Sequence, residues 1–524
     1  MCKCTYLVNA NIRTMDAARP TASAAVIVDG VFEYVGDANV INKLFGGYPY
    51  DSCQHEIVDA KGADVVPGFN DSHMHALHCA GLNDIVSLHD AGSIEESLAR
   101  MESAKHRRAD GWIVAEGWNQ DRFDERRPLT KDDLDSVSDS IPIVATRVCG
   151  HVATANTAAL RMAGLSGHDG VLREGECGLV KNLIPAPDLE TQCGRLVAFQ
   201  ERLFEKGVTS IQSDDLGWIP DGQAERYINT IAFLSNSGEL AVRYALQASL
   251  GDTGSALQFF EAGSHEIHGK RFKVSHQKLF ADGSLGARTA WLHQPYTDAP
   301  NDSGIAVMDI GDMNARVELA AKYGVPSAIH VIGDAAFSQA LCTLGGTWYG
   351  SSHALNHALV HAQITNWDQI REAGSRGLNI LAQPVFLRTD APIVRDRVGD
   401  RADSSYRWRT MLGAGATVAF STDSPVEPFD PMLNMYCAIT RHGPDSTEPY
   451  LPDEAFTLDE ALYAYTAAGA RVSGESGLKG RIAHGQLADF VILDGKLNPN
   501  DPRALLTTGV RETFISGKSV WKKL

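Results

Sequence analysis

The sequence predicts an α/β protein built on a (β/α)8 TIM barrel. Two features favour this fold class: apolar, strand-like runs alternate with stretches of helix length, and eight such runs occur along the chain. A third is that residue types able to bind metal stand at the ends of several of them. The eight strand candidates are residues 64–72, 207–213, 243–250, 271–279, 325–331, 357–363, 378–385 and 416–422.

Both chain ends have a different pattern. Val-rich runs flank Asp29-Gly30, which is a hairpin signal, and similar short runs recur near the C-terminus. Neither end has enough strands for a stable core of its own. We therefore predict that residues 1–62 and 480–524 pair into one small β-sandwich, beside a barrel of residues 63–479.

The first βα unit of this barrel is unusually long. About 130 residues separate His75 from the second strand candidate, where a loop usually has about 2–6 residues. We interpret residues 83–195 as an inserted lid region over the C-terminal face of the barrel. Later connections read as ordinary helices; for example, Thr457 and Glu460 form a capping box at the start of a helix predicted over 457–471.

The bulk composition limits the possible partners. The chain has 524 residues, with 47 Lys and Arg against 65 Asp and Glu, which gives a net charge of −18. An acidic chain without basic runs disfavours nucleic acid or an anionic membrane as partner. Nine scattered cysteines predict no disulfide framework, and the sequence has no basic stretch followed by an apolar run near residue 1 and no apolar run of about 18 residues. We expect a cytoplasmic homo-oligomer, a dimer, that acts on a small-molecule substrate.

The stretch Val65 to His75 ends a strand candidate with His-Met-His. Alternate residues of a strand point the same way, so His73 and His75 can direct two imidazoles at one point. An isolated pair of this kind is more often solvated or in the core. Here the later strands end in matching residues, namely Lys278, His330, His361 and Asp423. In a (β/α)8 barrel the catalytic groups lie at the strand C-terminal ends, so we predict a metal site.

Two of these residues have a simpler explanation. Lys278 could be an inward-facing lysine paired with Asp282. Asp423 could be the N-cap of the following helix, which is compatible with a role in the site.

Several longer motifs resemble the amidohydrolase superfamily. The finer matches are to its amidohydrolase family 3 branch, which includes N-substituted formamide deformylases. The motifs are Pro67 to His75, Asp282 to Ala290, His330 to Asp334, Ser421 to Val426 and Gly485 to Asp489. Two positions depart from the family: an acid is more usual before His361, and a small residue is more usual at His276. The second departure leaves open whether His276 is a further ligand.

The resemblance implies a binuclear metal site. Lys278, carboxylated by CO2, would bridge two divalent ions; His73, His75 and Asp423 would complete one site, and His330 and His361 the other. Nitrogen and oxygen ligands suit Zn²⁺, with Mn²⁺, Fe²⁺ or Co²⁺ as alternatives. A hydroxide bridging the metals would be the nucleophile. Asp423 would act as general base and acid, taking its proton and passing it to the leaving nitrogen.

Three residues are weaker candidates for substrate contacts. His151 is either a substrate or oxyanion contact or a satisfied loop histidine. Trp118 either lines the pocket, as part of an aromatic wall with Trp112 and Phe123, or belongs to the core. Arg288 either holds an anionic group of the substrate or pairs with Asp282.

The sequence thus predicts an enzyme that hydrolyses a C–N bond. The bond would be an amide, formamide, urea or carbamate of a small, mainly apolar or aromatic molecule, not a peptide. The alternatives are a deaminase or an ester or lactone hydrolase of the same superfamily, and an inactive, metal-free scaffold. Deaminases typically lack the bridging lysine and have a Glu soon after the fifth-strand histidine, where this chain has Val-Ile-Gly-Asp. An inactive scaffold would be expected to lose ligands, and none of the six is missing.

Overall fold

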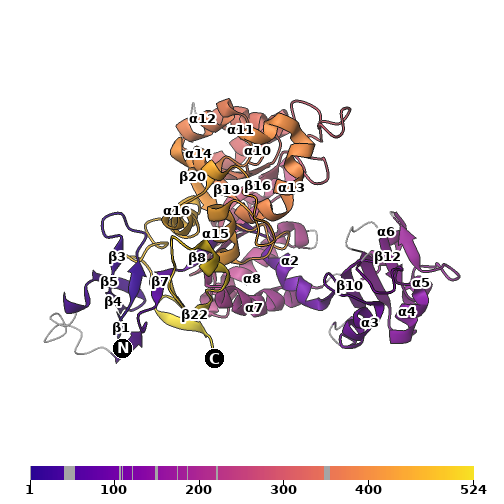
Figure 1. Cartoon of the computed structure of the whole chain (residues 1–524), viewed down its shortest axis with the longest axis horizontal. Coiled ribbons are helices and arrows are strands. Elements are labelled where there is room, and N and C mark those ends of the chain that lie inside the picture. Colours follow the sequence, from indigo (N-terminus) through magenta and orange to yellow (C-terminus); the bar gives the residue numbers. More distant parts are fainter. Residues whose placement is uncertain are drawn as a thin grey trace. The chain divides into compact units, whose positions relative to one another are not determined.

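The structure of the chain is a computed structural model (Figure 1). It describes residues 2–40, 54–105, 108, 110–120, 122–147, 152–173, 175–185, 187–219, 222–346 and 355–524. The chain folds into two compact units. One combines Met1–Ala76 with Leu196–Leu524, and the other is Leu77–Arg195.

The larger unit contains a barrel of eight parallel strands, in the order β20-β19-β18-β17-β16-β15-β14-β8. The strands are β8 (Phe69–Met74), β14 (Val208–Ser213), β15 (Arg243–Ser249), β16 (Phe272–Phe280), β17 (Ser327–Val331), β18 (Ala358–His361), β19 (Asn379–Ala382) and β20 (Thr417–Phe420). The first and last strands meet, because the Asp423 N–H donates to the His73 carbonyl at 2.9 Å. The predicted (β/α)8 fold is confirmed.

Helices alternate with these strands, as a parallel sheet requires. They are α7 (Leu189–Glu205), α8 (Ala224–Ser237), α9 (Thr253–Glu261), α10 (Ile310–Lys322), α11 (Asp334–Gly346), α12 (Trp367–Ser375), α13 (Leu387–Val398), α14 (Trp408–Gly413), α15 (Pro431–Thr440), α16 (Leu458–Ala464) and α17 (Ala467–Val472). The capping box at Thr457 and Glu460 is present. The helix predicted over 457–471 is interrupted after α16, where the Tyr465 carbonyl accepts the Asn70 N–H of β8 instead of continuing the helix.

The first strand candidate, residues 64–72, is two strands. Asp64–Pro67 forms β7, which belongs to another sheet, and β8 begins at Phe69. Gly68 makes this change of sheet possible, because a Cβ there would lie 2.1 Å from Thr209 Oγ1. Continuous apolar character alone did not reveal the break.

The two chain ends meet in one six-stranded sheet, β23-β22-β21-β7-β2-β3. Strand β7 pairs with β2 on one side and with the C-terminal β21 on the other. Its remaining strands are β2 (Asn11–Arg13), β3 (Thr21–Ala22), β21 (Phe490–Leu493), β22 (Val510–Ile515) and β23 (Lys518–Lys522). Neither chain end forms this sheet by itself.

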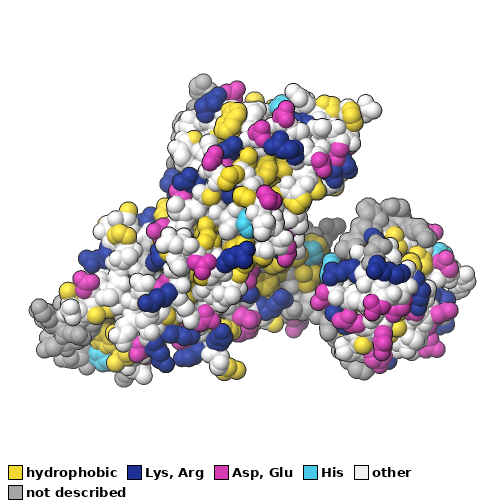
Figure 2. Space-filling view, viewed as in Figure 1, with side chains coloured by type: hydrophobic (Ala, Val, Ile, Leu, Met, Phe, Trp, Pro, Cys, Tyr) yellow, Lys and Arg dark blue, Asp and Glu magenta, His cyan; other side chains and the backbone are white. Residues whose placement is uncertain are grey.

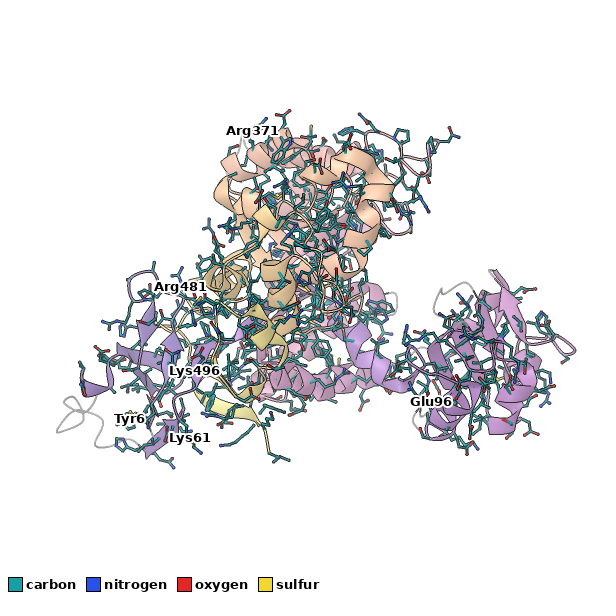
Figure 3. All side chains as sticks on the ribbon, in the orientation of Figure 1. Tyr6, Lys61, Glu96, Arg371, Arg481 and Lys496 are labelled. Carbon is teal, nitrogen blue, oxygen red and sulfur yellow. The ribbon has the colours of Figure 1, made fainter. Side chains whose placement is uncertain are left out.

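A second sheet, of N-terminal strands only, has the order β5-β4-β1-β6. Its strands are β1 (Lys3–Val8), β4 (Ala24–Val28), β5 (Val31–Gly36) and β6 (Gln54–Asp59). Tyr6 of β1, labelled in Figure 3, is hydrogen bonded to His55 of β6 at 2.8 Å. One apolar cluster combines residues of both sheets, among them Leu7, Ile27, Phe490 and Phe514.

The smaller unit, Leu77–Arg195, has its own sheet in the order β13-β12-β11-β10-β9. These strands are β9 (Ile85–Ser87), β10 (Ile113–Trp118), β11 (Ile143–Arg147), β12 (Val152–Ala155) and β13 (Val171–Arg173). Its helices include α3 (Ile94–Glu102), α4 (Lys131–Val137), α5 (Thr157–Met162) and α6 (Gly175–Lys181). Two apolar clusters give this unit a core. Its role as a lid stays a prediction.

The surface shown in Figure 2 intersperses basic and acidic side chains. No helix among the described residues has both the length and the apolar character needed to cross a lipid bilayer. Cys2 is disulfide-bonded, whereas Cys4, Cys79, Cys177, Cys193, Cys342 and Cys437 are not in disulfide bonds. The spacing of the cysteines did not predict the disulfide bond at Cys2.

Candidate metal centre

The six candidate ligands lie at the C-terminal ends of barrel strands. His73, Lys278, His330 and His361 belong to β8, β16, β17 and β18, while His75 and Asp423 follow β8 and β20 directly. Because all eight strands are parallel, these ends meet at one edge of the barrel. The structure brings all six side chains together there.

The first group consists of His73, His75 and Asp423. The Nε2 atoms of His73 and His75 lie 3.4 and 3.2 Å from Asp423 Oδ1. One ligand atom from each residue lies within 4.8 Å of the others, a spacing that could hold a metal ion. Lys278 Nζ adjoins this group, 3.3 Å from His73 Nε2.

The second group consists of His330 and His361. Nδ1 of His330 lies 3.0 Å from Nε2 of His361, and the two ring centroids are 4.4 Å apart. The His361 ring also faces that of His73 edge-on, with centroids 6.0 Å apart. The two groups therefore form one continuous cluster.

The hydrogen bonds fix which nitrogen of each imidazole is protonated. On each ring, one nitrogen faces an oxygen that can only accept, so that nitrogen is the donor. The pairs are His73 Nδ1 with Gln247 Oε1 (2.6 Å), His75 Nδ1 with the Asp214 carbonyl (2.8 Å), His330 Nε2 with the Gly283 carbonyl (3.0 Å) and His361 Nδ1 with Gln383 Oε1 (2.8 Å). The other nitrogen of His73, His330 and His361 directs a lone pair into the cluster, whereas His75 Nε2–H donates to Asp423 Oδ1 at 3.2 Å.

This arrangement fits a divalent metal. The lone pairs of His330 Nδ1 and His361 Nε2 face each other at 3.0 Å, which is unfavourable for two neutral rings unless a cation lies between or beside them. Neutral imidazole is the form that binds metal. Together with the Asp423 carboxylate, the donor set has the nitrogen and oxygen character that Zn²⁺ prefers.

Burial controls the ionisation of the cluster. It lowers the pKa of His361 to about 4 and also lowers the pKa of His73, His330 and Lys278. For His75, burial works in the same direction, but the hydrogen bond to Asp423 outweighs it and raises the pKa to about 9. For Asp423, burial favours the neutral form, yet the hydrogen bond from His75 and the neighbouring histidines hold the pKa below its ordinary range. Asp423 is therefore an anion among mostly neutral rings.

Two of the ligands have left-handed backbone conformations. φ is 76° at His361 and 55° at Asp423. Non-glycine residues adopt this region rarely, and such positions concentrate at functional sites. The Asp71 carboxylate holds the preceding Thr422, accepting its N–H at 3.0 Å and its hydroxyl at 2.5 Å. The strand end is thus fixed before the chain turns at Asp423.

Sequence reasoning missed five residues around the cluster. Gln247 and Gln383 support imidazoles, and Asp214 lies with Oδ2 3.7 Å from Lys278 Nζ. Phe280 and Phe386 lie beside the imidazoles of His330 and His361, with centroid distances of 5.7 and 6.0 Å. Each lies in the C-terminal half of a predicted strand or just after it, and that position was a signal that could have found them.

The alternative pairings of Lys278 and Arg288 with Asp282 are wrong. Lys278 pairs with Asp214, and Arg288 Nη2 pairs with Asp298 Oδ2 at 2.9 Å. Asp282 instead accepts the backbone N–H groups of Trp291, Ile332 and Gly333. A buried carboxylate with three amide donors does not need a cationic partner. Asp423 is not the cap of the next helix either, because Asp430 caps α15.

The other candidates that the structure describes have hydrogen-bond partners of their own. His276 Nε2 bonds to the Asn356 carbonyl at 3.0 Å and Nδ1 to the Ser275 hydroxyl at 3.1 Å, so its ring is satisfied without a metal. His151 lies outside the described residues. Trp118 is 1% exposed, and its Nε1–H donates to the Ala145 carbonyl at 2.9 Å.

The predicted aromatic wall is not present as such. Trp118 and Phe123 belong to one apolar cluster of the smaller unit and Trp112 to the other. All three rings are therefore core residues. A sequence pattern does not separate a core tryptophan from one that lines a pocket, because both are large, apolar and able to donate one hydrogen bond.

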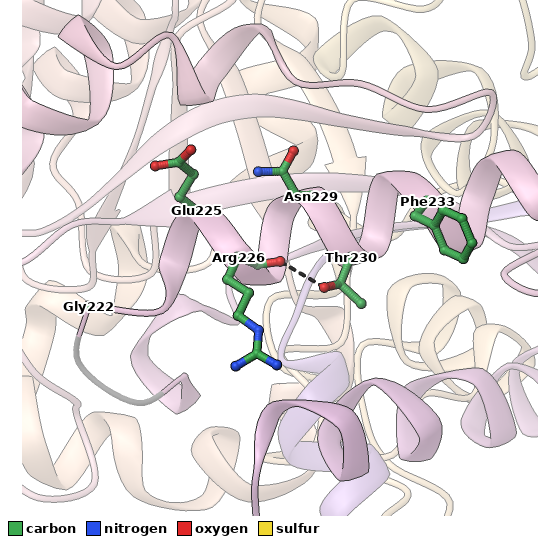
Figure 4. Close-up of a pocket in the computed structure, with 6 residues that line it drawn as sticks. All are labelled: Gly222, Glu225, Arg226, Asn229, Thr230 and Phe233. Atoms are coloured by element: carbon green, nitrogen blue, oxygen red, sulfur yellow. Dashed lines mark hydrogen bonds between the residues drawn. The ribbon is translucent and has the colours of Figure 1, made fainter.

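A pocket of about 360 Å³ adjoins the cluster. Its apolar lining includes Leu250, Phe280, Val307 and Met308, and its polar lining includes Lys278, Asp252, Asp309, Asp312 and Arg316. A second hollow, of about 580 Å³, lies on α8 and is lined by Gly222, Glu225, Arg226, Asn229, Thr230 and Phe233 (Figure 4). None of the candidate ligands lines this second hollow, whereas Lys278 lines the first.

Comparison with known proteins identifies the family. The profile of the amidohydrolase family matches residues 56–521. The chain is 28% identical to YtcJ of Bacillus subtilis, over 98% of both proteins, and 25% identical to the N-substituted formamide deformylase of Arthrobacter pascens, over 98% of this chain and 97% of that enzyme. Among solved structures, an uncharacterized metal-dependent hydrolase from Pyrococcus horikoshii superposes with a TM-score of 0.78 and 30% identity, over 95% of this chain and 98% of that one. As its sequence motifs indicated, the chain belongs to the amidohydrolase family.

Proposed function

We propose that this protein is a binuclear metal-dependent hydrolase that cleaves a C–N bond of a small amide, formamide, urea or carbamate. The observation that carries the proposal is the convergence of four imidazole rings, one carboxylate and one buried amine at the C-terminal end of the barrel. The structural and enzymatic relatives, a metal-dependent hydrolase and a formamide deformylase, support the same class.

Two divalent ions, of which Zn²⁺ suits the donors best, would share these residues. His73, His75 and Asp423 would hold one ion, His330 and His361 the other, and Lys278 would contribute to both. To bind both ions, Lys278 would be converted to a carbamate by addition of its neutral amine to CO2. In this step an N–C bond forms and one N–H proton is released. The resulting carbamate has two oxygens and one remaining N–H. Burial favours the neutral amine that this step needs.

When bound, the ions would polarise the substrate carbonyl and make an attacking water more acidic. Asp423 is placed to handle the proton. It is held as an anion, and its Oδ1 lies between His73 and His75. We propose that Asp423 takes the proton of the attacking water and delivers it to the nitrogen of the breaking C–N bond.

Phe280 and Phe386 support an apolar or aromatic substrate. Their rings flank the imidazole cluster, and Phe280 also lines the adjoining pocket of about 360 Å³. A pocket of this size suits a small molecule held by apolar contacts and a few polar groups. This aromatic surface comes from the barrel strands, not from the inserted unit, which we still propose to act as a lid.

Elemental analysis tests the metal site. The protein purified and dialysed with Zn²⁺ and bicarbonate should contain two metal ions per chain, and ¹³C-labelled bicarbonate should give one carbamate resonance that disappears in Lys278→Met. One metal per chain under these conditions, or a protein that binds none, would exclude the binuclear proposal and favour a different site or an inactive scaffold.

A substrate panel tests the reaction. The Zn²⁺- and Mn²⁺-loaded protein should hydrolyse N-formyl or N-acyl amines, ureas or carbamates, with aromatic members preferred over short aliphatic ones. Nucleobases, lactones, esters and phosphotriesters in the same panel represent the alternatives within the superfamily. Faster turnover of any of these than of every amide would replace the C–N assignment while leaving the metal proposal in place.

A further inference from the structure

We propose that Gln247 and Gln383 are positioning residues that set the tautomer and ring orientation of two metal-binding histidines without adding charge to the site. The inference rests on the proposed metal centre. Both side chains are fully buried, Gln247 on β15 and Gln383 directly after β19. Neither touches the predicted metal positions; each acts through one imidazole.

Gln247 supports His73. Its Nε2 donates to the Ser72 carbonyl at 3.1 Å, which fixes the orientation of the carboxamide. Oε1 then faces His73 Nδ1 at 2.6 Å and can only accept, so Nδ1 carries the proton. The unprotonated Nε2 of His73 is directed at Lys278 Nζ and Asp423, 3.3 and 3.4 Å away.

Gln383 supports His361 in the same way. Its Nε2 donates to the Leu381 carbonyl at 2.8 Å and to Ser421 Oγ at 2.7 Å. Oε1 accepts the Nδ1–H of His361 at 2.8 Å, which leaves His361 Nε2 free toward His330. Two glutamines on separate strands therefore make the same arrangement at opposite parts of the cluster.

The use of an amide has a consequence for charge. Metal-bound histidines commonly donate their second N–H to a carboxylate or to a backbone carbonyl. Here the nitrogen of each imidazole that faces away from the cluster donates to an uncharged oxygen: a backbone carbonyl for His75 and His330, and a glutamine carboxamide for His73 and His361. A carboxylate at Gln247 or Gln383 would add an anion to a buried site that already contains Asp423 and Asp214.

If these side chains had a purely structural role, replacing any comparable buried glutamine of the barrel should have the same effect. Gln212 provides the matched case, because it is also buried on a barrel strand, β14, and its Nε2 donates to the Gly469 carbonyl at 2.9 Å. If the amides only fill space and satisfy carbonyls, replacing Gln212 should affect the protein as much as replacing Gln247. If Gln247 and Gln383 position imidazoles, only their replacement should change the histidines.

The test uses the full chain with Gln247→Leu, Gln383→Leu, Gln247→Glu and the control Gln212→Leu. Zn²⁺ affinity is measured by competition with a chelator, and histidine tautomers by ¹⁵N shifts in metal-free, ¹⁵N-histidine-labelled protein. The two Leu variants should bind Zn²⁺ about 10- to 100-fold more weakly and lose the single Nδ1–H tautomer of the supported ring. Gln247→Glu should keep the tautomer and bind Zn²⁺ at least as tightly as the parent, and Gln212→Leu should match the parent in both.

Unchanged tautomers in both Leu variants, or an equal loss of affinity in Gln212→Leu, would overturn the inference. If a Leu variant does not fold, the matching Asn variant, Gln247→Asn or Gln383→Asn, replaces it in the test. The shorter amide keeps its polarity but does not reach the imidazole. Retention of the Nδ1–H tautomer in the Asn variant would also overturn the inference. A parent protein that binds no Zn²⁺ would refute the proposed function, while the tautomers of the metal-free protein would still judge the role of the glutamines.

Discussion

The two ends of the barrel both bury ionisable side chains, but they satisfy them differently. At the C-terminal end, the lone pairs of His330 and His361 face each other at 3.0 Å. At the N-terminal end, Arg243 opens β15 and forms an ion pair through two nitrogens with Asp489, and its Nη2 also donates to Ser516 Oγ at 2.9 Å. There, the buried charges of Arg243 and Asp489 are paired with each other.

Lys479 extends the satisfied cluster. Its Nζ lies 3.1 Å from Glu475 and donates to Ser210 Oγ of β14 at 2.9 Å. Burial and the charge of Arg243 act oppositely on Asp489, and the net effect lowers its pKa. A buried cluster whose charges are paired stabilises the contact between the barrel strands and the C-terminal segment. A cluster whose lone pairs converge is instead incomplete without a ligand. The cluster at the N-terminal end therefore stabilises the fold, whereas the cluster at the C-terminal end is the candidate functional site.

The largest expected effect concerns Asp423. Asp423→Asn keeps the shape of the side chain but removes the anion that would carry the proton. We expect turnover of an identified substrate to fall about 10²- to 10⁴-fold, with the fold and at least one metal retained. Steady-state kinetics, elemental analysis and circular dichroism measure the three quantities. Near-normal turnover would remove Asp423 from the mechanism.

At the opposite end of the barrel, Arg243→Met should cost stability instead of activity. It leaves the Asp489 carboxylate buried without its partner, which we expect to lower the free energy of unfolding by about 3–5 kcal/mol. Metal content should not change. Chemical unfolding provides the measurement, and the double variant Arg243→Met with Asp489→Leu should recover much of the loss. Loss of metal in the single variant would show that the two clusters are coupled.

Asp390, on α13, differs from both clusters, because its carboxyl accepts a hydrogen bond from a neutral group, the Tyr406 hydroxyl, at 2.9 Å. Burial raises its pKa to about 6 from an ordinary value of 3.8. A raised native pKa stabilises the fold below about pH 4, and this contribution is lost as the pH rises through 6. Asp390→Asn should therefore gain stability relative to the parent between pH 4 and 7, by at most about 3 kcal/mol.

Unfolding of both proteins at pH 4.5 and pH 7.5 measures this difference. A gap that does not widen with pH would mean that Asp390 is ionised in the native protein and paired more fully than its contacts indicate.

The smallest effect is expected at Arg288. The side chain is part of a surface network in which Asp298 pairs with both Arg288 and Arg397. Surface ion pairs contribute little to stability, so Arg288→Ala should leave the thermal midpoint and metal content unchanged. KM should also stay the same, because the guanidinium is occupied by Asp298. A tenfold rise in KM for an anionic substrate would restore Arg288 as a substrate contact.

Local sequence patterns are sufficient to predict the barrel and the position of its candidate ligands. Alternation of apolar runs with helix-length stretches reflects a parallel sheet buried on both faces, and this pattern is local. The placement of His73, Lys278, His330 and His361 at strand ends then follows from the topology, since parallel strands end at one edge. The six candidate ligands could be named for this reason, before any distance was known.

The pairings between strands depend on the tertiary structure. The partners of Lys278 and Arg288 are Asp214 and Asp298, and Asp282, the alternative partner that the sequence suggested for each, was wrong, because hydrogen bonding depends on which strand ends and loops come into contact. The same holds for Gln247 and Gln383, whose amides meet imidazoles 174 and 22 residues away along the chain. Local sequence patterns encode the direction of a side chain relative to its own strand, whereas the neighbour across the barrel is set by register, closure and packing of the whole fold.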